Sequence, residues 1–123
     1  MESNQLVTLS KQFAVEIINL CERMKRRGKA SGIISQLLRS GTSIGANIHE
    51  ANYASSKADF INKFQIALKE CYETDYWLDI FHDSKIVTDE EYEKMFAQCS
   101  KIRKMLIASI TTAKKNAEKK GTN

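Results

Sequence analysis

The sequence predicts an all-α protein that folds as an up-down antiparallel four-helix bundle. Its 123 residues include no Pro and five Gly, which argues against a turn-rich β protein and favours long helices with short connections. Four segments repeat apolar residues at the spacing of one helix face. A chain of this length is typical of one domain, so we expect a single domain over residues 1–123, with helices at roughly 9–27, 32–54, 57–82 and 89–114.

The first predicted helix, at roughly 9–27, has an apolar stripe with further apolar residues beside it. Thr8 or Ser10 is a suitable N-cap, and Gly28 is suited to a left-handed C-cap after a basic last turn. Val15 and Ile18 lie beside the stripe, which indicates a second buried contact beyond the bundle core. The stripe itself comprises Phe13, Ile17, Leu20, Cys21 and Met24.

The second predicted helix, at roughly 32–54, has small residues where a soluble helix usually carries bulk. Gly41 and Gly45 share one face with Leu37, Ile44 and Ile48. Each interior Gly costs a helix about 1 kcal/mol relative to Ala, so two of them four residues apart indicate that a neighbouring backbone packs closely. A neighbouring stripe is polar and comprises Arg39, Ser43, Asn47 and Glu50.

The third predicted helix, at roughly 57–82, begins with a capping box formed by Ser56 and Asp59. Trp77 and Phe81 broaden its apolar surface near the end, and we expect them, like Val15, to be available to another subunit. The main stripe comprises Phe60, Phe64, Ala67, Leu68, Cys71, Asp75 and Leu78.

The fourth predicted helix, at roughly 89–114, has the clearest start signal in the chain. Thr88 and Glu91 form a capping box, and three carboxylates lie in the first turn, where the helix dipole is positive. The apolar seam comprises Tyr92, Met95, Phe96, Cys99, Ile102, Leu106, Ser109 and Ile110. Residues 115–123 lose this pattern, and we expect them to fray into solvent as a basic tail.

Polar residues of the second and third predicted helices are positioned to pair. An antiparallel turn at Ser55 brings Glu50 near the start of the third helix and Arg39 near Glu70 and Glu73. Buried pairs of this kind fix register more than they add stability. We therefore predict a structural role in helix packing for Arg39, Gly41, Ser43, Gly45, Asn47, Glu50, Glu70 and Glu73.

One run within the second predicted helix is long and unusual: RSGTSIGANI at residues 39–48, followed by Glu50-Ala51. Together with residues 51–60 and 66–78, it resembles the bacterial four-helix-bundle family encoded in intervening sequences of 23S ribosomal RNA genes, from about Phe13 to the fourth helix. The resemblance implies an up-down four-helix bundle that assembles into a homopentamer, and a distant similarity to the accessory protein of diversity-generating retroelements. It implies no settled biochemical activity.

Positive charge is expected to gather at one end of the bundle. The chain has a net charge of +4 and a pI near 9.0, which favours contact with polyanions. In an up-down bundle the start of the first helix, the second turn and the end of the fourth helix share one pole. Three acidic residues lie there, against Lys11, Lys57, Lys63, Lys114, Lys115, Lys119 and Lys120. At the opposite pole five basic and five acidic residues nearly cancel.

Two motifs match patterns found in enzymes, but the sequence around each of them does not fit the enzyme structure that the motif requires. Residues 41–45 match the G-x-S-x-G hydrolase elbow, but that motif needs a strand before a tight turn, and here helical periodicity continues through both glycines. Asp79 and His82 have the spacing of a di-iron ligand pair, but a bundle site needs two such pairs. The three cysteines lack metal-ligand spacing and lie on apolar stripes. We predict no catalytic residue, no metal and no cofactor.

The first hypothesis for this protein is a non-enzymatic function. The N-terminal residues are polar and no apolar run approaches the ~20 residues of a membrane span, so we expect a cytoplasmic protein that makes no membrane contact. We predict a homo-oligomer, pentameric by the family resemblance, that binds RNA or a nucleoprotein through phosphate contacts. The alternative is a protein scaffold that binds a partner helix, and a metal- or hydrolase-type enzyme comes third.

Overall fold

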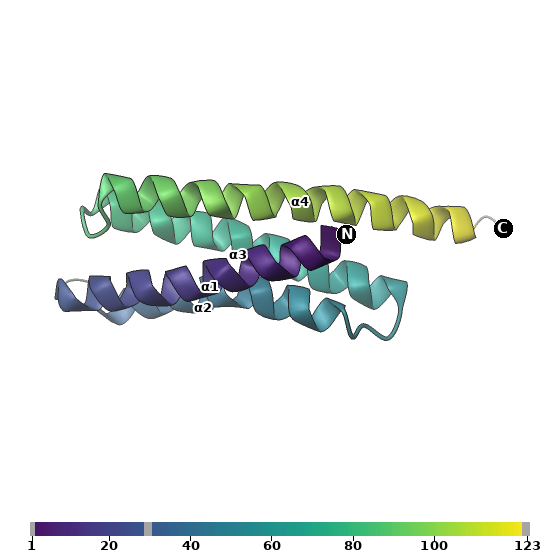
Figure 1. Ribbon diagram of the computed structural model, residues 1–123, viewed down its shortest axis with the longest axis horizontal. Helices are drawn as coiled ribbons and strands as arrows, with labels where there is room; N and C mark the ends of the chain where they lie inside the picture. The colour runs from purple at the N-terminus through teal and green to yellow at the C-terminus, as the bar shows by residue number, and fades with distance from the viewer. Residues whose placement is uncertain (1, 29–30, 122–123) are drawn as a thin grey trace.

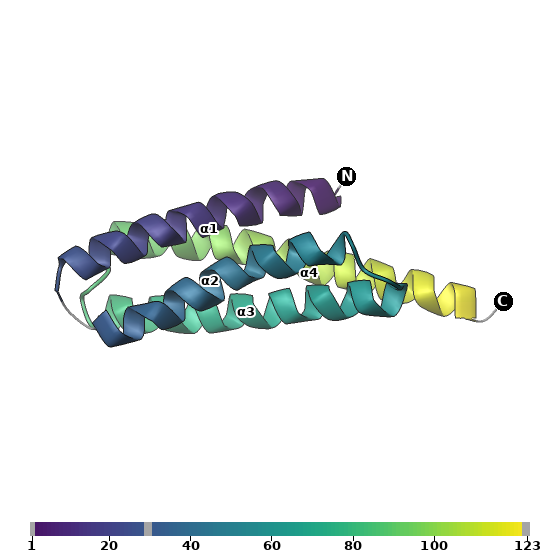
Figure 2. The same cartoon turned by 90° about the horizontal axis from the view of Figure 1, so that it is seen from below.

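The computed structural model describes residues 2–28 and 31–121, which form four helices (Figure 1). They are α1 (Glu2–Arg26), α2 (Ser31–Ala51), α3 (Lys57–Asp83) and α4 (Asp89–Gly121). No strand occurs in the part of the chain that is described. Consecutive helices run in opposite directions in both views (Figures 1 and 2), so the predicted all-α up-down bundle is confirmed.

The helices follow one another around the bundle axis. α1 packs against α2 and α4, and α3 packs against the same two helices. α1 and α3 are therefore diagonal to each other, and so are α2 and α4. The core between them is filled by apolar side chains from all four helices, and the largest of the fully buried ones are Phe13, Phe64, Phe81, Leu6, Ile17, Leu20, Met24, Ile34, Leu37, Ile44, Ile48 and Leu78.

α1 begins at Glu2, earlier than the predicted start near residue 9. Leu6 is fully buried, so the buried stripe starts about two helical turns before Phe13, where the predicted stripe begins. Thr8 donates its hydroxyl to the carbonyl of Asn4 at 3.1 Å, and Ser10 donates to that of Val7 at 3.3 Å. Both expected caps therefore lie inside the helix and bond to the preceding turn.

The other helix ends agree with the predicted capping but differ in extent. Gly28 follows α1 with φ +75°, the left-handed conformation expected of it. α2 ends at Ala51, three residues before the predicted 54, because 52–54 form successive turns. α3 ends at Asp83, one residue after the predicted 82. The prediction of a frayed tail is wrong for residues 115–121, since α4 continues to Gly121, and residues 122–123 lie outside the described part of the chain.

Two apolar residues that were expected to be exposed and available to another subunit are buried or partly buried. Phe81 is 1% exposed and belongs to the core. Its carbonyl accepts from the amides of Ile86 and Val87 in the turn after α3. Trp77 is partly buried against the core. Val15 and Ile18 of α1 remain exposed, at 52% and 45%. The thiols of Cys21, Cys71 and Cys99 are buried and free, and burial raises the pKa of Cys21 to about 11.

None of the described helices has a stretch that is both long enough and apolar enough to cross a membrane.

Candidate functional site

The N-terminus, the α2–α3 connection and the end of α4 lie at the same end of the bundle (Figure 1). We call this end the basic pole. It carries the predicted lysines of three helices: Lys11 on α1, Lys57 and Lys63 on α3, and Lys114, Lys115 and Lys119 on α4. The side chain of Lys120 lies outside the described residues. The fold thus brings together the segments from which the lysines were predicted to converge.

The lysines of α4 stand on a helix that projects beyond its neighbours. In both views the last turns of α4 run past the first turn of α3 and past the start of α1 (Figures 1 and 2). Residues 111–121 contain Ala, Lys and Glu, which are strong helix formers, and no Pro. Lys114 and Lys115 are exposed, and Lys115 and Lys119 lie one turn apart on the same side of the helix. The projecting segment therefore holds its charges at fixed spacing.

The remaining lysines of the pole differ in how far they are neutralised. Lys63 Nζ lies 3.4 Å from Glu50 Oε1, so part of its charge is compensated. Lys57 is the first residue of α3, directly after the N-cap Ser56. A cation at this place adds to the positive end of the helix dipole, although Asp59 in the same turn offsets it. Lys57, Lys114 and Lys115 are thus the best-placed groups for an anion.

The opposite pole has a charge network built around one carboxylate. Glu91 accepts from Arg23 Nε at 2.8 Å and from both terminal nitrogens of Arg27 at 2.9 Å. It also caps α4, since Glu91 Oε1 accepts from the Thr88 amide at 3.0 Å and Thr88 Oγ1 accepts from the Glu91 amide at 3.1 Å. The hydrogen bond from Arg27 is the main reason that the pKa of Glu91 falls to about 2. Arg23 and Arg27 thus already have a protein partner.

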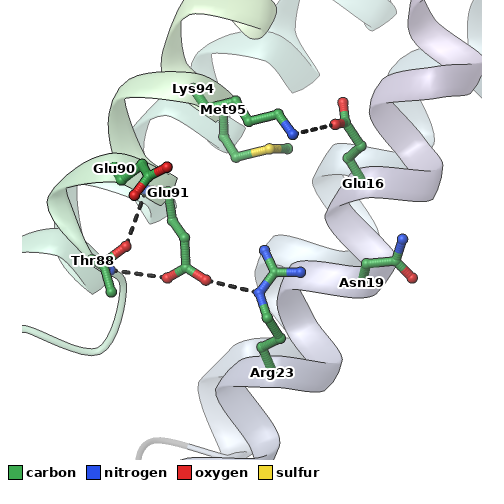
Figure 3. A pocket seen from close by; sticks show the side chains of 8 residues that line it. All are labelled: Glu16, Asn19, Arg23, Thr88, Glu90, Glu91, Lys94 and Met95. Atoms are coloured by element: carbon green, nitrogen blue, oxygen red, sulfur yellow. Dashed lines mark hydrogen bonds and ion pairs between the residues drawn. The ribbon is translucent and has the colours of Figure 1, made fainter.

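A polar hollow of about 440 Å³ lies beside this network, between α1 and α4. Figure 3 shows Arg23 and Glu91 reaching toward each other across it, and Lys94 reaching toward Glu16. Lys94 Nζ and Glu16 Oε1 are 2.8 Å apart, and this bond lowers the pKa of Glu16. The charged groups of the hollow are thus largely paired across the helices, which suits a structural contact better than a ligand site.

The small residues of α2 allow α1 to approach closely. A Cβ at Gly41 would lie 2.9 Å from two side-chain carbons of Ile17, and one at Gly45 would lie 3.2 Å from the carbonyl oxygen of Ser10. Ser43 and Asn47 bond within α2, to the carbonyls of Arg39 and Ser43. We keep the proposal that Gly41, Gly45, Ser43 and Asn47 serve the packing of this helix.

The polar stripe of α2 faces α3. Arg39 Nη1 donates to Glu70 at 3.0 Å, and Nη2 bonds to Glu73. Glu73 also accepts from Trp77 Nε1 at 3.1 Å, and the bond from Arg39 is the main cause that lowers the pKa of Glu73. The side chain of Arg39 is half exposed, so these bonds fix the register of α2 on α3 at the bundle surface.

One buried polar contact between these helices was not predicted. Thr74 Oγ1 donates to Ser40 Oγ at 3.0 Å, and both residues are fully buried. Each lies on the core stripe of its helix, four residues from an apolar neighbour. A hydroxyl on an otherwise apolar stripe is the signal that could have identified this pair.

The two enzymatic motifs lie in other structural contexts than their chemistry requires. Residues 41–45 lie inside α2, no strand occurs among the described residues before them, and the Ser43 hydroxyl donates to a backbone carbonyl at 2.6 Å. His82 Nε2 lies 2.7 Å from Asp89 Oδ1, while Asp79 accepts from Tyr92 at 2.5 Å. No group of three or more potential metal ligands occurs among the described residues.

Comparisons with known proteins agree with this architecture. A family model described as 23S rRNA-intervening sequence protein matches residues 2–108. A crystal structure of a protein of unknown function, from the S23 ribosomal protein family of Bacteroides thetaiotaomicron VPI-5482, is also similar. It shares 46% sequence identity and a TM-score of 0.88, over 90% of this chain and 99% of that chain. No curated protein matches.

Proposed function

Because the chain belongs to the family of 23S rRNA-intervening sequence proteins, we propose that it is a non-enzymatic, homo-oligomeric helical bundle of the cytoplasm. It binds RNA or a nucleoprotein through phosphate contacts at its basic pole. The pentameric state is proposed from the family resemblance. A ring of copies multiplies the charge of each pole, which strengthens phosphate binding without any further contact within a copy.

The observation that carries this proposal is the lysine array on the projecting end of α4. Lys114 and Lys115 lie on the last turns of a continuous helix, with Lys57 at the start of the neighbouring α3. At the opposite pole, by contrast, Arg23 and Arg27 are bound to Glu91. Lysines act as point charges toward phosphate, so this arrangement supports backbone contacts with little dependence on base sequence.

The test is a salt titration of binding to unrelated single-stranded RNAs. Each lysine–phosphate contact steepens the fall of log affinity with log salt by about 0.7 on single strands. Replacing Lys114, Lys115, Lys119 and Lys120 by Gln should weaken binding to all sequences alike and flatten the slope. The control variant, with the same change in charge, replaces Lys25, Arg26, Lys101 and Lys104 by Gln, and should bind as wild type does. Equal loss in both variants, or no binding at low salt, refutes the proposal.

The oligomer is tested separately. Val15 and Ile18 are exposed on α1, one turn apart, at 52% and 45%. We expect a mass above that of a monomer in light scattering at micromolar concentration. Replacing both residues by Glu should lower that mass, whereas Gln36→Glu with Asn62→Glu, at exposed sites elsewhere, should not. A monomeric wild type contradicts the proposal.

A further inference from the structure

A groove of about 660 Å³ lies at the basic pole, and its walls are the core faces of three helices. Ala51 ends the buried stripe of α2, and Phe64 begins that of α3. On α4, Ala113 lies one turn beyond Ile110, the last buried residue of its seam. Phe60 packs on Phe64 with ring centroids 4.4 Å apart. The groove is therefore a continuation of the bundle core that lies open to solvent, and we call it the slot.

The open side of this groove is the position that a fourth helix would occupy in a complete bundle. α2 and α4 form two of its walls and are diagonal in the bundle, while α3 forms the floor. The position that remains between α2 and α4, opposite α3, is the one that α1 occupies in the rest of the bundle. α1 does not reach the groove, because none of its described residues lines it. In both views the N-terminal end of α1 does not reach as far along the bundle as the first turn of α3, while α4 extends beyond both (Figures 1 and 2).

The dimensions suit a short helix. The α4 wall runs from Ser109 to Asn116, about 12 Å of helix at 1.5 Å per residue, or two turns. Neighbouring helix axes in a bundle are about 8–10 Å apart, so a segment that takes the fourth position would pack small and apolar side chains on Phe60 and Ala113. An amphipathic helix is the element whose apolar face matches such a slot.

The charge around the slot selects the kind of helix. Lys57 is the one charged residue among the described residues that line it, and the α4 segment that forms its wall carries Lys114 and Lys115. A helix with carboxylates beside its apolar stripe complements this surface. The projecting end of α4 from a second copy is rich in lysine and would meet like charge, which opposes self-association in the slot.

We propose that this slot binds an acidic amphipathic helix of a partner protein, which completes the four-helix bundle at the basic pole. The partner's helix takes the position of α1, sets its apolar residues on Phe60 and Phe64, and pairs its carboxylates with Lys57. This site shares Lys57 with the proposed phosphate contacts, whereas Lys114 and Lys115 do not line it.

The experiment uses the full chain and two fluorescein-labelled peptides of about 14 residues, or four helical turns. Both carry Leu and Ala at helical spacing; the first has Glu at its flanking positions and the second has Lys. Fluorescence anisotropy at low salt should show binding of the Glu peptide and none of the Lys peptide. Ala113→Trp fills the slot and should weaken binding of the Glu peptide at least tenfold, while Thr111→Trp, exposed on another side of α4, should not. Lys57→Glu should weaken it too, and Lys69→Glu, at an exposed site away from the slot, should have no effect.

Four results overturn the proposal, and each is distinct from failure of RNA binding. If the two peptides bind alike, or if Ala113→Trp binds the Glu peptide as wild type does, the slot holds no acidic helix. If Ala113→Trp lowers the mass in light scattering, a second copy fills the slot. If neither peptide binds but Ala113→Trp weakens binding to poly(U) RNA, the groove receives bases. Circular dichroism of each variant establishes that it is folded as wild type.

Discussion

The close approach of α1 to α2 can be tested with a single methyl group at Gly41. A Cβ built there lies 2.9 Å from Cγ1 and from Cγ2 of Ile17, and 3.3 Å from its Cβ. Carbon atoms pack best at about 3.5–4.0 Å, so one helix has to move by several tenths of an ångström. Ile17 is fully buried and branched at Cβ, and therefore has little freedom to turn aside.

Two opposing effects determine the stability of Gly41→Ala. Ala is favoured over Gly in a helix interior by about 1 kcal/mol, whereas overpacking a core costs about 1–3 kcal/mol. We expect the variant to be less stable than wild type by about 0–2 kcal/mol. Gly32→Ala is the matched control, because Gly32 lies in the same helix and a Cβ added to it would have nothing within 4 Å. It should be stabilised by up to about 1 kcal/mol.

The assay is urea unfolding followed by circular dichroism, at one protein concentration because assembly makes the midpoint depend on it. A second measurement isolates the contact with Ile17. In an Ile17→Ala background both Cγ atoms are absent, so Gly41→Ala should become stabilising, whereas Ile17→Val keeps both atoms and should give no relief. If Gly41→Ala stabilises the wild type as much as Gly32→Ala does, the helices are not in close contact at this site.

Two further predictions concern the polar contacts. The pKa of Glu91 is depressed from 4.5 to about 2. The stability that Glu91 contributes is therefore present above pH 4.5 and lost as the pH falls toward 2. This pKa shift corresponds to at most about 3 kcal/mol of unfolding free energy. Glu91→Gln should lose that stability at pH 7 and show a flatter urea midpoint between pH 5 and 2, unlike Glu90→Gln; equal pH profiles for the two variants would contradict it. Thr74→Val leaves the buried Ser40 hydroxyl without its side-chain donor and should cost about 1–2 kcal/mol of stability. Adding Ser40→Ala should recover much of this loss. A double variant no more stable than Thr74→Val would show that the two hydroxyls are not coupled.

Much of the fold could be predicted because it rests on local patterns. The core stripes of α2, α3 and α4 follow the 3.6-residue period, and Thr88 with Glu91 forms the cap that its spacing indicates. The pairing of Arg39 with Glu70 and Glu73 follows from antiparallel geometry once a turn is placed near Ser55. These features need only the sequence spacing and the direction of the chain.

The features that were missed depend on contacts between distant segments. Thr8 and Ser10 have the residue types of a cap, but burial of Leu6 extends α1 beyond them. The burial of Phe81 cannot be inferred from α3 alone, because it depends on the other helices that form the core around it. The two arginines that bind Glu91 lie 68 and 64 residues from it in the chain, and only the packing of α1 on α4 brings them to it.

One structural cause accounts for both candidate features of the basic pole. α4 has 33 residues and α1 has 25, and at the opposite pole the two helices meet through Arg23 and Glu91. The difference in length therefore appears at the basic pole, where α4 continues without α1 beside it. This leaves the core faces of α2, α3 and α4 open as an apolar slot. The same extension carries Lys114 and Lys115 away from the carboxylates that neutralise the other end. Shortening α4 after Ile110 should consequently remove the lysine array and the slot wall together, whereas Ala113→Trp separates them, because it fills the slot and keeps every lysine in place.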